Sequence, residues 1–484
     1  MTLLDRLTAE GKHQLYIGGE WREASDGRTM DVVDPATEDV IATVASGSPD
    51  DMLAAVGAAH EAMPGWAATS PRHKSEVLRR AFDLLIEREK EFAELITREN
   101  GKTLSDSLGE VRYGAEFLRW FSEEAVRIRG DVYDAPAGDK KIFVIHQPVG
   151  VSLLVTPWNF PLSMGTRKIG PALAAGCGVV LKPASDTPLI ALALADLFEE
   201  AGVPAGLVNV VPADRSSATV NAALEDDRVR KLSFTGSTEV GRILLEAASQ
   251  RVLRTSMELG GNAPFLVLAD ADVDRAVEGA LLAKMRNAGE ACTAANRFYV
   301  HDAVADEFAE KLSAGMARMR LGAGMDEGTD VGPLINASTR DKVADLVNDA
   351  SGSGTVVLGG SSPDRKGYFY SPTVIKDVAR SAGILATEIF GPVAPIVRWE
   401  DLDDAVDQAN DVEVGLISYV YSGDTKQAMQ IAERLEAGMV AVNRGLISDP
   451  AAPFGGWKQS GLGREGSYQG LHEYLEEKYV GVDW

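Results

Sequence analysis

Cysteine is scarce in this chain, which holds only Cys177 and Cys292 among its 484 residues. Two cysteines cannot form the disulfide framework of a small secreted protein, so we expect a reducing compartment, the cytoplasm. The six histidines are scattered, and no Cys-x-x-Cys pair is present. Because the usual spacings of metal ligands are missing, we predict no metal site.

Long apolar runs and an excess of positive charge are missing as well. No segment approaches the roughly 20 apolar residues that cross a bilayer. Met1–Arg6 lacks the basic and apolar parts of a secretion signal. With 48 Lys and Arg against 72 Asp and Glu, the net charge is −24, which repels nucleic acid and anionic membranes. We therefore expect a small-molecule partner, and an anionic substrate would need local cations.

The chain does contain a long stretch in which strand and helix patterns alternate. The predicted strands are Val151–Val155, Gly178–Lys182, Leu207–Val211, Lys231–Phe234 and Val252–Glu258. The predicted helices between them are Thr166–Ala175, Pro188–Ala201, Ser216–Glu225 and Thr238–Ala248. This alternation predicts an α/β fold with a Rossmann-like parallel sheet, which binds ligands at the carboxyl ends of its strands.

A second alternating unit follows the first. It comprises predicted helices at Val273–Met285 and Thr425–Leu435 and predicted strands at Arg297–Val300, Thr355–Leu358 and Leu416–Tyr421. We interpret Tyr16–Val44 as a short β meander and residues 49–129 as amphipathic helices that serve packing only. The isolated strands Lys140–Val151 and Lys478–Trp484 suggest an oligomerisation arm.

The expected domain organisation follows from these units. We predict a cofactor-binding domain at residues 1–126 and 151–258 and a catalytic domain at residues 259–457. The oligomerisation arm would comprise residues 127–150 and 471–484, and we expect a homodimer or homotetramer.

Polar groups follow several of the predicted strands. Asn159 lies after the first strand, Lys182 ends the second, Gly236 and Ser237 follow the fourth, and Glu258 ends the fifth. A glycine turn that opens a helix can hold an anion at the free N–H groups. Each feature alone also permits a structural reading: a turn, a snorkelling lysine or a paired acid. Likewise, Cys292 among small residues could be a reactive thiol or a core residue.

Taken together, the motifs resemble the aldehyde dehydrogenase superfamily over essentially the whole chain. The matching segments are Thr156–Pro161, Lys182–Ser185, Phe234–Gly241, Glu258–Gly261, Cys292 and Glu388–Pro392. The resemblance implies that Cys292 is the nucleophile, that Asn159 stabilises the oxyanion, that Glu258 activates water and that Lys168 relays a proton. It assigns cofactor binding to Thr156, Pro157, Trp158, Lys182, Ser185, Gly236, Ser237, Glu388 and Phe390.

Ser185 bears on the choice of cofactor. Relatives that favour NAD often carry Glu at this position, and a carboxylate there would repel the 2′-phosphate of NADP. Because Ser185 removes that repulsion and Lys182 adds positive charge, we predict that NADP is preferred and that NAD is a slower substitute.

Three residues bear on the aldehyde. Arg167, Arg286 and Ser467 resemble the groups with which succinate-semialdehyde dehydrogenases bind the distal carboxylate of the substrate, and paired guanidinium groups suit a planar carboxylate. Either arginine could instead form a structural ion pair. Three other functions remain open: oxidation of glutarate semialdehyde or another aldehyde, a catalytically silent scaffold, and a thioesterase that needs no nicotinamide.

Two departures from the family pattern matter. Glu290 replaces the usual Gln two positions before the nucleophile, and we expect it to point away from the sulfur, whose ionisation it would oppose. Ala294 replaces a second cysteine that some relatives use for a redox disulfide. We interpret Cys177 as a core residue.

Overall fold

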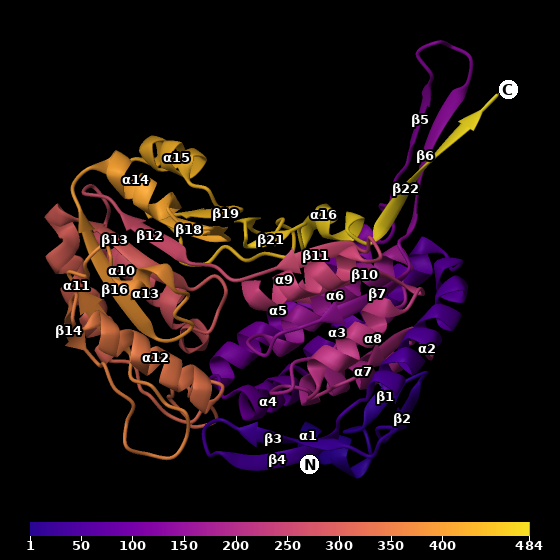
Figure 1. Ribbon diagram of the computed structural model, residues 1–484, viewed down its shortest axis with the longest axis horizontal. Helices are drawn as coiled ribbons and strands as arrows, with labels where there is room; N and C mark the ends of the chain where they lie inside the picture. Colours follow the sequence, from indigo (N-terminus) through magenta and orange to yellow (C-terminus); the bar gives the residue numbers. More distant parts are fainter. Residues whose placement is uncertain (484) are drawn as a thin grey trace.

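The computed structural model describes residues 1–483, which form two α/β lobes and a projecting arm (Figure 1). The first lobe contains an eight-stranded sheet of order β2-β1-β9-β8-β7-β10-β11-β21. Its central strands are β7 (Val151–Val155), β8 (Val179–Lys182), β9 (Val208–Val210), β10 (Val229–Thr235) and β11 (Arg254–Glu258). These five strands are parallel. Their chain order of 3-2-1-4-5 is that of a Rossmann-type sheet, which confirms the predicted fold class.

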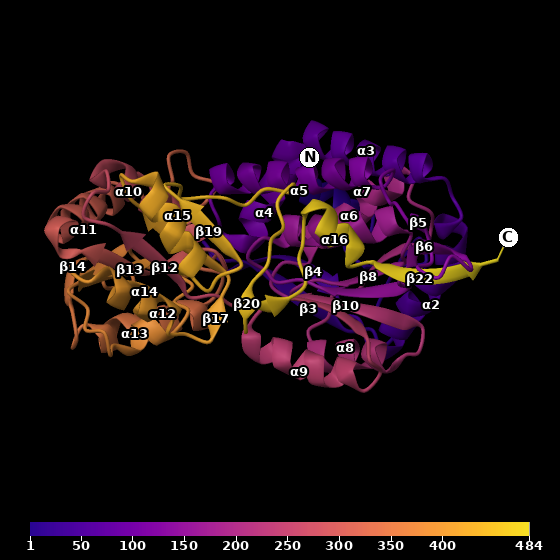
Figure 2. The ribbon, with the colours of Figure 1, turned by 90° about the horizontal axis from the view of Figure 1, so that it is seen from above.

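Helices cover both faces of this sheet. They include α6 (Pro161–Ala175), α7 (Leu189–Ala201), α8 (Ser216–Glu225) and α9 (Thr238–Ser249), and Figure 2 shows α8 and α9 on the face opposite α3 and α7. Helix α6 begins five residues before the predicted start because Pro161 occupies its first turn, where proline needs no N–H partner. Val252, predicted as a strand residue, instead has φ +53 in a turn before β11.

The amino-terminal region differs from the predicted meander. Strands β1 (Leu15–Ile17) and β2 (Glu20–Arg22) extend the large sheet beside β9, whereas β3 (Thr29–Asp34) and β4 (Asp39–Ala45) form a separate hairpin. The remaining helices of this region are α1 (Leu3–Ala9), α2 (Pro49–Ala67), α3 (Pro71–Glu87), α4 (Glu89–Asn100) and α5 (Leu104–Glu124).

The second lobe contains a seven-stranded sheet of order β14-β15-β16-β13-β12-β18-β19. Its strands are β12 (Ala263–Val267), β13 (Ala295–His301), β14 (Thr355–Leu358), β15 (Thr373–Lys376), β16 (Val393–Trp399), β18 (Ile417–Tyr421) and β19 (Met439–Val442). Its helices are α10 (Val273–Met285), α11 (Asp302–Ala317), α12 (Ala337–Ala350), α13 (Gly383–Ala386), α14 (Leu402–Asn410) and α15 (Thr425–Arg434). The lobe encloses its own hydrophobic core.

Short elements connect the lobes to the carboxyl-terminal arm. They are β20 (Trp457–Lys458), β21 (Gly461–Leu462) and α16 (Ser467–His472), and β20 pairs with the short strand β17 (Val414–Gly415) that precedes β18. Strand β21 pairs with β11 and thereby returns the chain to the first sheet.

The arm is a three-stranded sheet that extends away from both lobes (Figure 1). It comprises β5 (Asp131–Asp134), β6 (Lys141–Pro148) and β22 (Leu475–Val482), and the predicted strand end at Trp484 lies outside the described residues. Its exposed apolar side chains are Val132, Tyr133, Ile145, Tyr479 and Val480. No helix within residues 1–483 is both long and apolar enough to span a membrane.

Candidate active site

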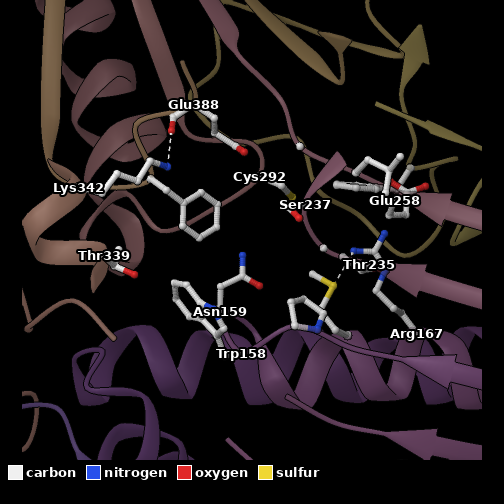
Figure 3. A pocket seen from close by; sticks show the side chains of 17 residues that line it. Trp158, Asn159, Arg167, Thr235, Ser237, Glu258, Cys292, Thr339, Lys342 and Glu388 are labelled. Carbon is white, nitrogen blue, oxygen red and sulfur yellow. Dashed lines mark hydrogen bonds between the residues drawn. The ribbon is translucent and has the colours of Figure 1, made fainter. Parts of the chain in front are cut away.

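Two cavities meet at the thiol of Cys292. The first, of about 240 Å³, lies between the lobes, and Figure 3 shows its lining side chains. The second, of about 180 Å³, is lined largely from α5, α6 and the loop after β19. Four residues line both cavities: Met164, Arg167, Cys292 and Phe454. One thiol is therefore accessible from two differently built compartments.

The loop that carries Cys292 is held in an unusual conformation. Asn287 and Ala288 have φ values of +51 and +50 between the end of α10 and the nucleophile. The side-chain amide of Asn287 donates to the carbonyls of Asn159 (3.0 Å) and Glu290 (3.2 Å). A Cβ at Gly289 would come within 2.3 Å of the Gly391 carbonyl oxygen, so only glycine fits there. Hydrogen bonds to several segments thus offset the backbone strain.

The thiol itself is a poor acid in this environment. Burial is the main cause that raises the pKa of Cys292 to about 12, and the nearby carboxyls of Glu388 and Glu258 contribute in the same direction. Arg167 and Arg286 act in the opposite direction. Since the thiolate is the nucleophile, the two arginines favour the reactive form.

Asn159 lies beside the nucleophile at the start of α6. Its side-chain nitrogen donates to the Glu290 carbonyl over 3.2 Å, and its side-chain oxygen accepts from the Phe160 N–H over 3.1 Å. The side chain is buried and lines the first cavity (Figure 3). The amide therefore presents an N–H donor close to where an oxyanion on a Cys292 adduct would develop.

Glu258 ends β11 and also lines the first cavity (Figure 3). Both carboxyl oxygens are buried and lack a hydrogen-bond partner among the described residues. Burial and the neighbouring Glu465 hold the pKa of Glu258 well above its usual range. A buried carboxyl with a raised pKa and free oxygens is suited to take a proton from a water molecule.

Glu465 is a site residue that the sequence analysis missed. Its carboxylate forms an ion pair with Arg167 Nε over 2.5 Å and accepts a hydrogen bond from Lys168 Nζ, which also donates to Ser233 Oγ over 3.0 Å. Burial opposes ionisation, but Arg167 and Lys168 hold the pKa of Glu465 below its usual value. Lys168 lines neither cavity. The sequence alone could not show this cluster, because Lys168 and Glu465 lie 297 positions apart.

The first cavity extends from Cys292 to the ends of both sheets. Trp158 and Phe390 meet edge to face with ring centroids 5.5 Å apart. Glu388 Oε1 accepts from the Gly261 N–H over 3.2 Å, and burial raises the pKa of Glu388 to about 7. A Cβ at Gly260 would come within 2.8 Å of the Glu388 carboxylate. Thr339 and Lys342 of α12, which the sequence analysis did not select, line this wall too.

The same cavity reaches the amino terminus of α9. Ser237 caps this helix by accepting from the Val240 N–H over 3.3 Å, and Gly236 precedes it at the cavity wall. Free N–H groups at a helix start bind phosphate. Backbone at Gly236, the Glu388 carboxylate and the aromatic pair therefore fit a dinucleotide laid across the strand ends.

Three predicted cofactor residues lie outside the cavity lining. Lys182 is buried at the end of β8, and burial lowers its pKa to about 8, with Asp186 opposing the shift. Ser185 follows in a partly exposed position. The Thr156 N–H donates to the Lys182 carbonyl over 3.2 Å, which joins the loops after β7 and β8.

Comparison with known proteins shows which family this chain resembles. Residues 21–480 match the aldehyde dehydrogenase family. The chain belongs to that family. It is 54% identical to a succinate-semialdehyde dehydrogenase of Paenarthrobacter nicotinovorans over 92% of this chain and 99% of the relative. It is 49% identical to a glutarate-semialdehyde dehydrogenase of Pseudomonas putida over 97% of each chain. A crystal structure described as an NADP-dependent enzyme of E. coli superposes with a TM-score of 0.96 at 48% identity, covering 98% of each chain.

The second cavity of this aldehyde dehydrogenase carries an arginine without an acidic partner. Arg286 donates to Thr293 Oγ1 over 3.3 Å and lies over the Phe160 ring, 5.0 Å from its centroid. No salt bridge involves it among residues 1–483. Arg167 differs, because its Nε is committed to Glu465 while its guanidinium packs against Phe454, 4.2 Å from the ring centroid. The alternative of a structural ion pair therefore applies in part to Arg167 and not to Arg286.

Ser467 is not among the residues that line either cavity, which differs from its predicted place at the substrate carboxylate. It starts α16 with φ +53, and its N–H donates to the Pro450 carbonyl over 2.7 Å. That bond anchors the loop after β19, and a different serine on the loop, Ser448, lines the second cavity. Ser448 belongs to no sequence motif that would have indicated a role in the site.

Glu290 has the orientation expected in this aldehyde dehydrogenase. One carboxyl oxygen accepts from the Ile335 N–H over 3.0 Å, and the side chain lines neither cavity. Burial raises its pKa well above the usual range. No cluster of three or more His, Cys, Asp or Glu side chains suited to a metal occurs among the described residues.

Proposed function

We propose that this aldehyde dehydrogenase oxidises succinate semialdehyde to succinate with reduction of NADP. The observation that carries this proposal is Arg286, a guanidinium with no acidic partner among the described residues, in the cavity that opens on Cys292. In a chain of net charge −24, such a group is a specific receptor for the distal carboxylate of the aldehyde. Ser448 and the free edge of Arg167 complete this end of the cavity.

The chemistry begins at Cys292. The thiolate attacks the aldehyde carbonyl, and the Asn159 side-chain amide together with the Cys292 N–H stabilises the resulting oxyanion. Loss of one such donor commonly costs about 3 kcal/mol of transition-state stabilisation. Bound NADP supplies the hydride acceptor, and the product on Cys292 is a thioester.

Glu258 completes the reaction in this proposal. Its buried carboxylate takes a proton from a water molecule that attacks the thioester carbonyl, which releases succinate and restores the thiol. The charges of Arg167, Lys168 and Glu465 all act on the pKa of Glu258. Lys168 serves as part of the proton relay. The product is a free acid.

The cofactor would occupy the first cavity and extend beyond it to the ends of β7 and β8. Glu388 and Lys182 would bind the two riboses, and Ser237 and Gly236 would hold the pyrophosphate at the start of α9. Phe390, Trp158, Pro157 and Thr156 would lie on the nicotinamide side. Ser185 offers no negative charge to a 2′-phosphate, and Lys182 adds a positive one below its pKa of about 8. NADP is therefore preferred, with NAD as a slower substitute.

The same proposal covers organisation and place of action. Residues 1–126 and 151–258 form the cofactor-binding domain, residues 259–457 the catalytic domain, and residues 127–150 and 471–484 an arm for a homodimer or homotetramer. The exposed apolar groups of the arm, Tyr133 and Tyr479 among them, support this role. The enzyme acts in the cytoplasm on a small-molecule aldehyde.

Glutarate semialdehyde is the second candidate substrate, because the 49% identical Pseudomonas putida relative bears that name. It has one more methylene between aldehyde and carboxylate, a difference worth about 1–3 kcal/mol in a fitted pocket. The test follows the absorbance of the reduced cofactor with succinate semialdehyde, glutarate semialdehyde and butanal, each with NADP and NAD. The highest kcat/KM is expected for succinate semialdehyde with NADP. A butanal value equal to it would contradict the proposal.

A further inference from the structure

One segment outside the family motifs contacts both the loop that carries Asn159 and the loop that carries Cys292. Residues 100–110, which include the loop before α5 and its first turns, project Asn100, Lys102, Asp106 and Glu110 towards the site. The sequence pattern of this region indicates amphipathic packing and no chemistry. The hydrogen bonds of these four side chains lead to a different conclusion.

Lys102 is a fully buried cation. Its Nζ donates to the Asn159 carbonyl oxygen over 2.5 Å and to Glu110 Oε2 over 2.6 Å, and it lies 4.1 Å from the centroid of the Phe160 ring. Neither side chain of the Lys102–Glu110 pair is exposed. Since a buried ion pair is weak evidence for stability, a role in specifying one local geometry accounts better for its presence.

The second oxygen of Glu110 holds the other side of Asn159. Oε1 accepts from the N–H groups of Leu162 (2.9 Å) and Ser163 (3.2 Å) in the first turn of α6. The residue that precedes this helix, Phe160, supplies no capping side chain. Glu110 therefore caps α6 from another helix and satisfies N–H groups that would otherwise be unpaired.

The same segment reaches the flanking loops. Asn100 Nδ2 donates to the Trp158 carbonyl over 2.9 Å, and Asp106 Oδ2 accepts from the Asn287 N–H over 3.0 Å. Backbone groups on both sides of the proposed oxyanion site are thus anchored to one segment, which runs from the end of α4 to the first turns of α5. The Asn159 side-chain amide is held only by bonds to neighbouring backbone, with its nitrogen donating to the Glu290 carbonyl over 3.2 Å and its oxygen accepting from the Phe160 N–H over 3.1 Å, so its direction depends on the backbone that Lys102 and Glu110 hold.

We propose that Lys102 and Glu110 are positioning residues that fix the Asn159 amide for oxyanion stabilisation during attack by Cys292. This inference rests on the role proposed above for Asn159. The ion pair holds the carbonyl of Asn159 and the helix start that follows, so the side-chain amide keeps its direction. A displacement of about 1 Å in such a group can cost on the order of 100-fold in rate.

The experiment separates positioning from general stability by a double-mutant cycle. The rate of Cys292 acylation by p-nitrophenyl acetate is measured for the wild type, Lys102→Met, Asn159→Ala and the double variant. This ester needs neither cofactor nor a distal carboxylate, so it reports only on the nucleophile and the oxyanion site. Lys102→Met should slow acylation by roughly 10- to 100-fold, and it should add less than about twofold in the Asn159→Ala background.

Controls keep the test decisive. Lys231→Met removes another buried lysine, which donates to Ser256 Oγ over 2.6 Å, and its effect should multiply with that of Asn159→Ala. Glu110→Gln keeps one acceptor oxygen for the α6 N–H groups but loses the charge and the acceptor that face Lys102. It replaces Lys102→Met in the cycle if that variant does not fold. NADP affinity should be unchanged in all soluble variants.

The outcomes distinguish the two proposals. Full multiplication of the Lys102→Met and Asn159→Ala effects would overturn the positioning role while leaving the oxyanion role of Asn159 intact. Wild-type acylation by Asn159→Ala would overturn both roles. If the acylation rates follow the predicted double-mutant cycle but the enzyme does not oxidise succinate semialdehyde, the positioning role stands and only the proposed substrate is overturned.

Discussion

The two cavities on either side of Cys292 are built in different ways. The first lies where strand ends of both sheets meet, and its key groups come from short motifs such as Phe234–Gly236 and Glu258–Gly260. The second combines α5, α6 and the loop after β19, which are far apart in the sequence. The first contains buried carboxyls with raised pKa values, and the second contains the unpaired Arg286. Under the proposed function, short local motifs build the cofactor side, whereas long-range packing builds the substrate side.

Glu258→Gln should have the largest effect, because it removes the base from the cofactor side without changing the substrate cavity. We expect turnover to fall by about 10²- to 10⁴-fold, while the first equivalent of NADPH still forms. Stopped-flow measurement of the reduced cofactor checks this. Unimpaired steady-state turnover would show that another group activates water.

The same variant tests the raised pKa of Glu258 through stability. The folded chain binds the carboxyl proton more tightly than the unfolded chain, so this group costs stability as pH rises above the ordinary carboxyl range of about 4. Gln removes that cost. The free energy of unfolding should be higher for Glu258→Gln than for the wild type at about pH 9, and the difference should shrink towards acidic pH. Denaturant titrations at several pH values measure it.

Arg286→Ala should act on the other cavity alone. Loss of a charge-assisted hydrogen bond to the substrate carboxylate costs about 1.5–3 kcal/mol, which corresponds to roughly 10- to 150-fold in kcat/KM. The kcat/KM for butanal and the KM for NADP should change little. Arg167→Ala is the informative contrast: because its Nε binds Glu465, it should impair butanal oxidation too. Equal losses for both aldehydes in Arg286→Ala would remove the basis for the substrate assignment.

Ser185→Glu should alter the cofactor side alone. A carboxylate near the 2′-phosphate should shift the NADP-to-NAD ratio of kcat/KM towards NAD by about tenfold or more. The KM for succinate semialdehyde should remain unchanged. Kinetics with both cofactors test this, and a constant ratio would mean that the adenosine ribose lies elsewhere.

The smallest effect distinguishes two serines. Ser448→Ala should raise the KM for succinate semialdehyde by a few fold, as expected for loss of one hydrogen bond worth about 1 kcal/mol. Ser467→Ala is the matched control and should leave this KM unchanged, because Ser467 anchors the loop through its backbone N–H. The reverse pattern would restore the placement that the sequence suggested.

Much of the fold was predictable because its signals are local. Helix α10 (Val273–Met285) and helix α8 (Ser216–Glu225) have the predicted bounds. Boundary signals mark α10, which Asp272 caps and which carries Lys284 in its last turn. Sequence patterns did not reveal β12 or β16, which are buried strands without alternation. Nor could they assign β1 to the large sheet, because that pairing joins Tyr16 to Val210.

The site divides in the same way. Cys292, Glu258 and Asn159 belong to motifs whose order and spacing are diagnostic. Glu465 and Lys102 are recognisable only through contacts over 297 and 57 positions of sequence. Sequence spacing carries no information about such contacts without the fold, and the substrate role of Ser467, which lines neither cavity, remains a prediction.

The most direct test of the account is intact-mass and peptide analysis of Glu258→Gln after mixing with succinate semialdehyde. In the presence of NADP, we expect one succinyl group per chain, located on the peptide that contains Cys292. Without NADP the thioester should not form, because both cavities must be filled for the oxidation. A succinyl group on another residue such as Cys177, or full turnover with no modified Cys292, would contradict the claim that the two cavities operate on one thiol.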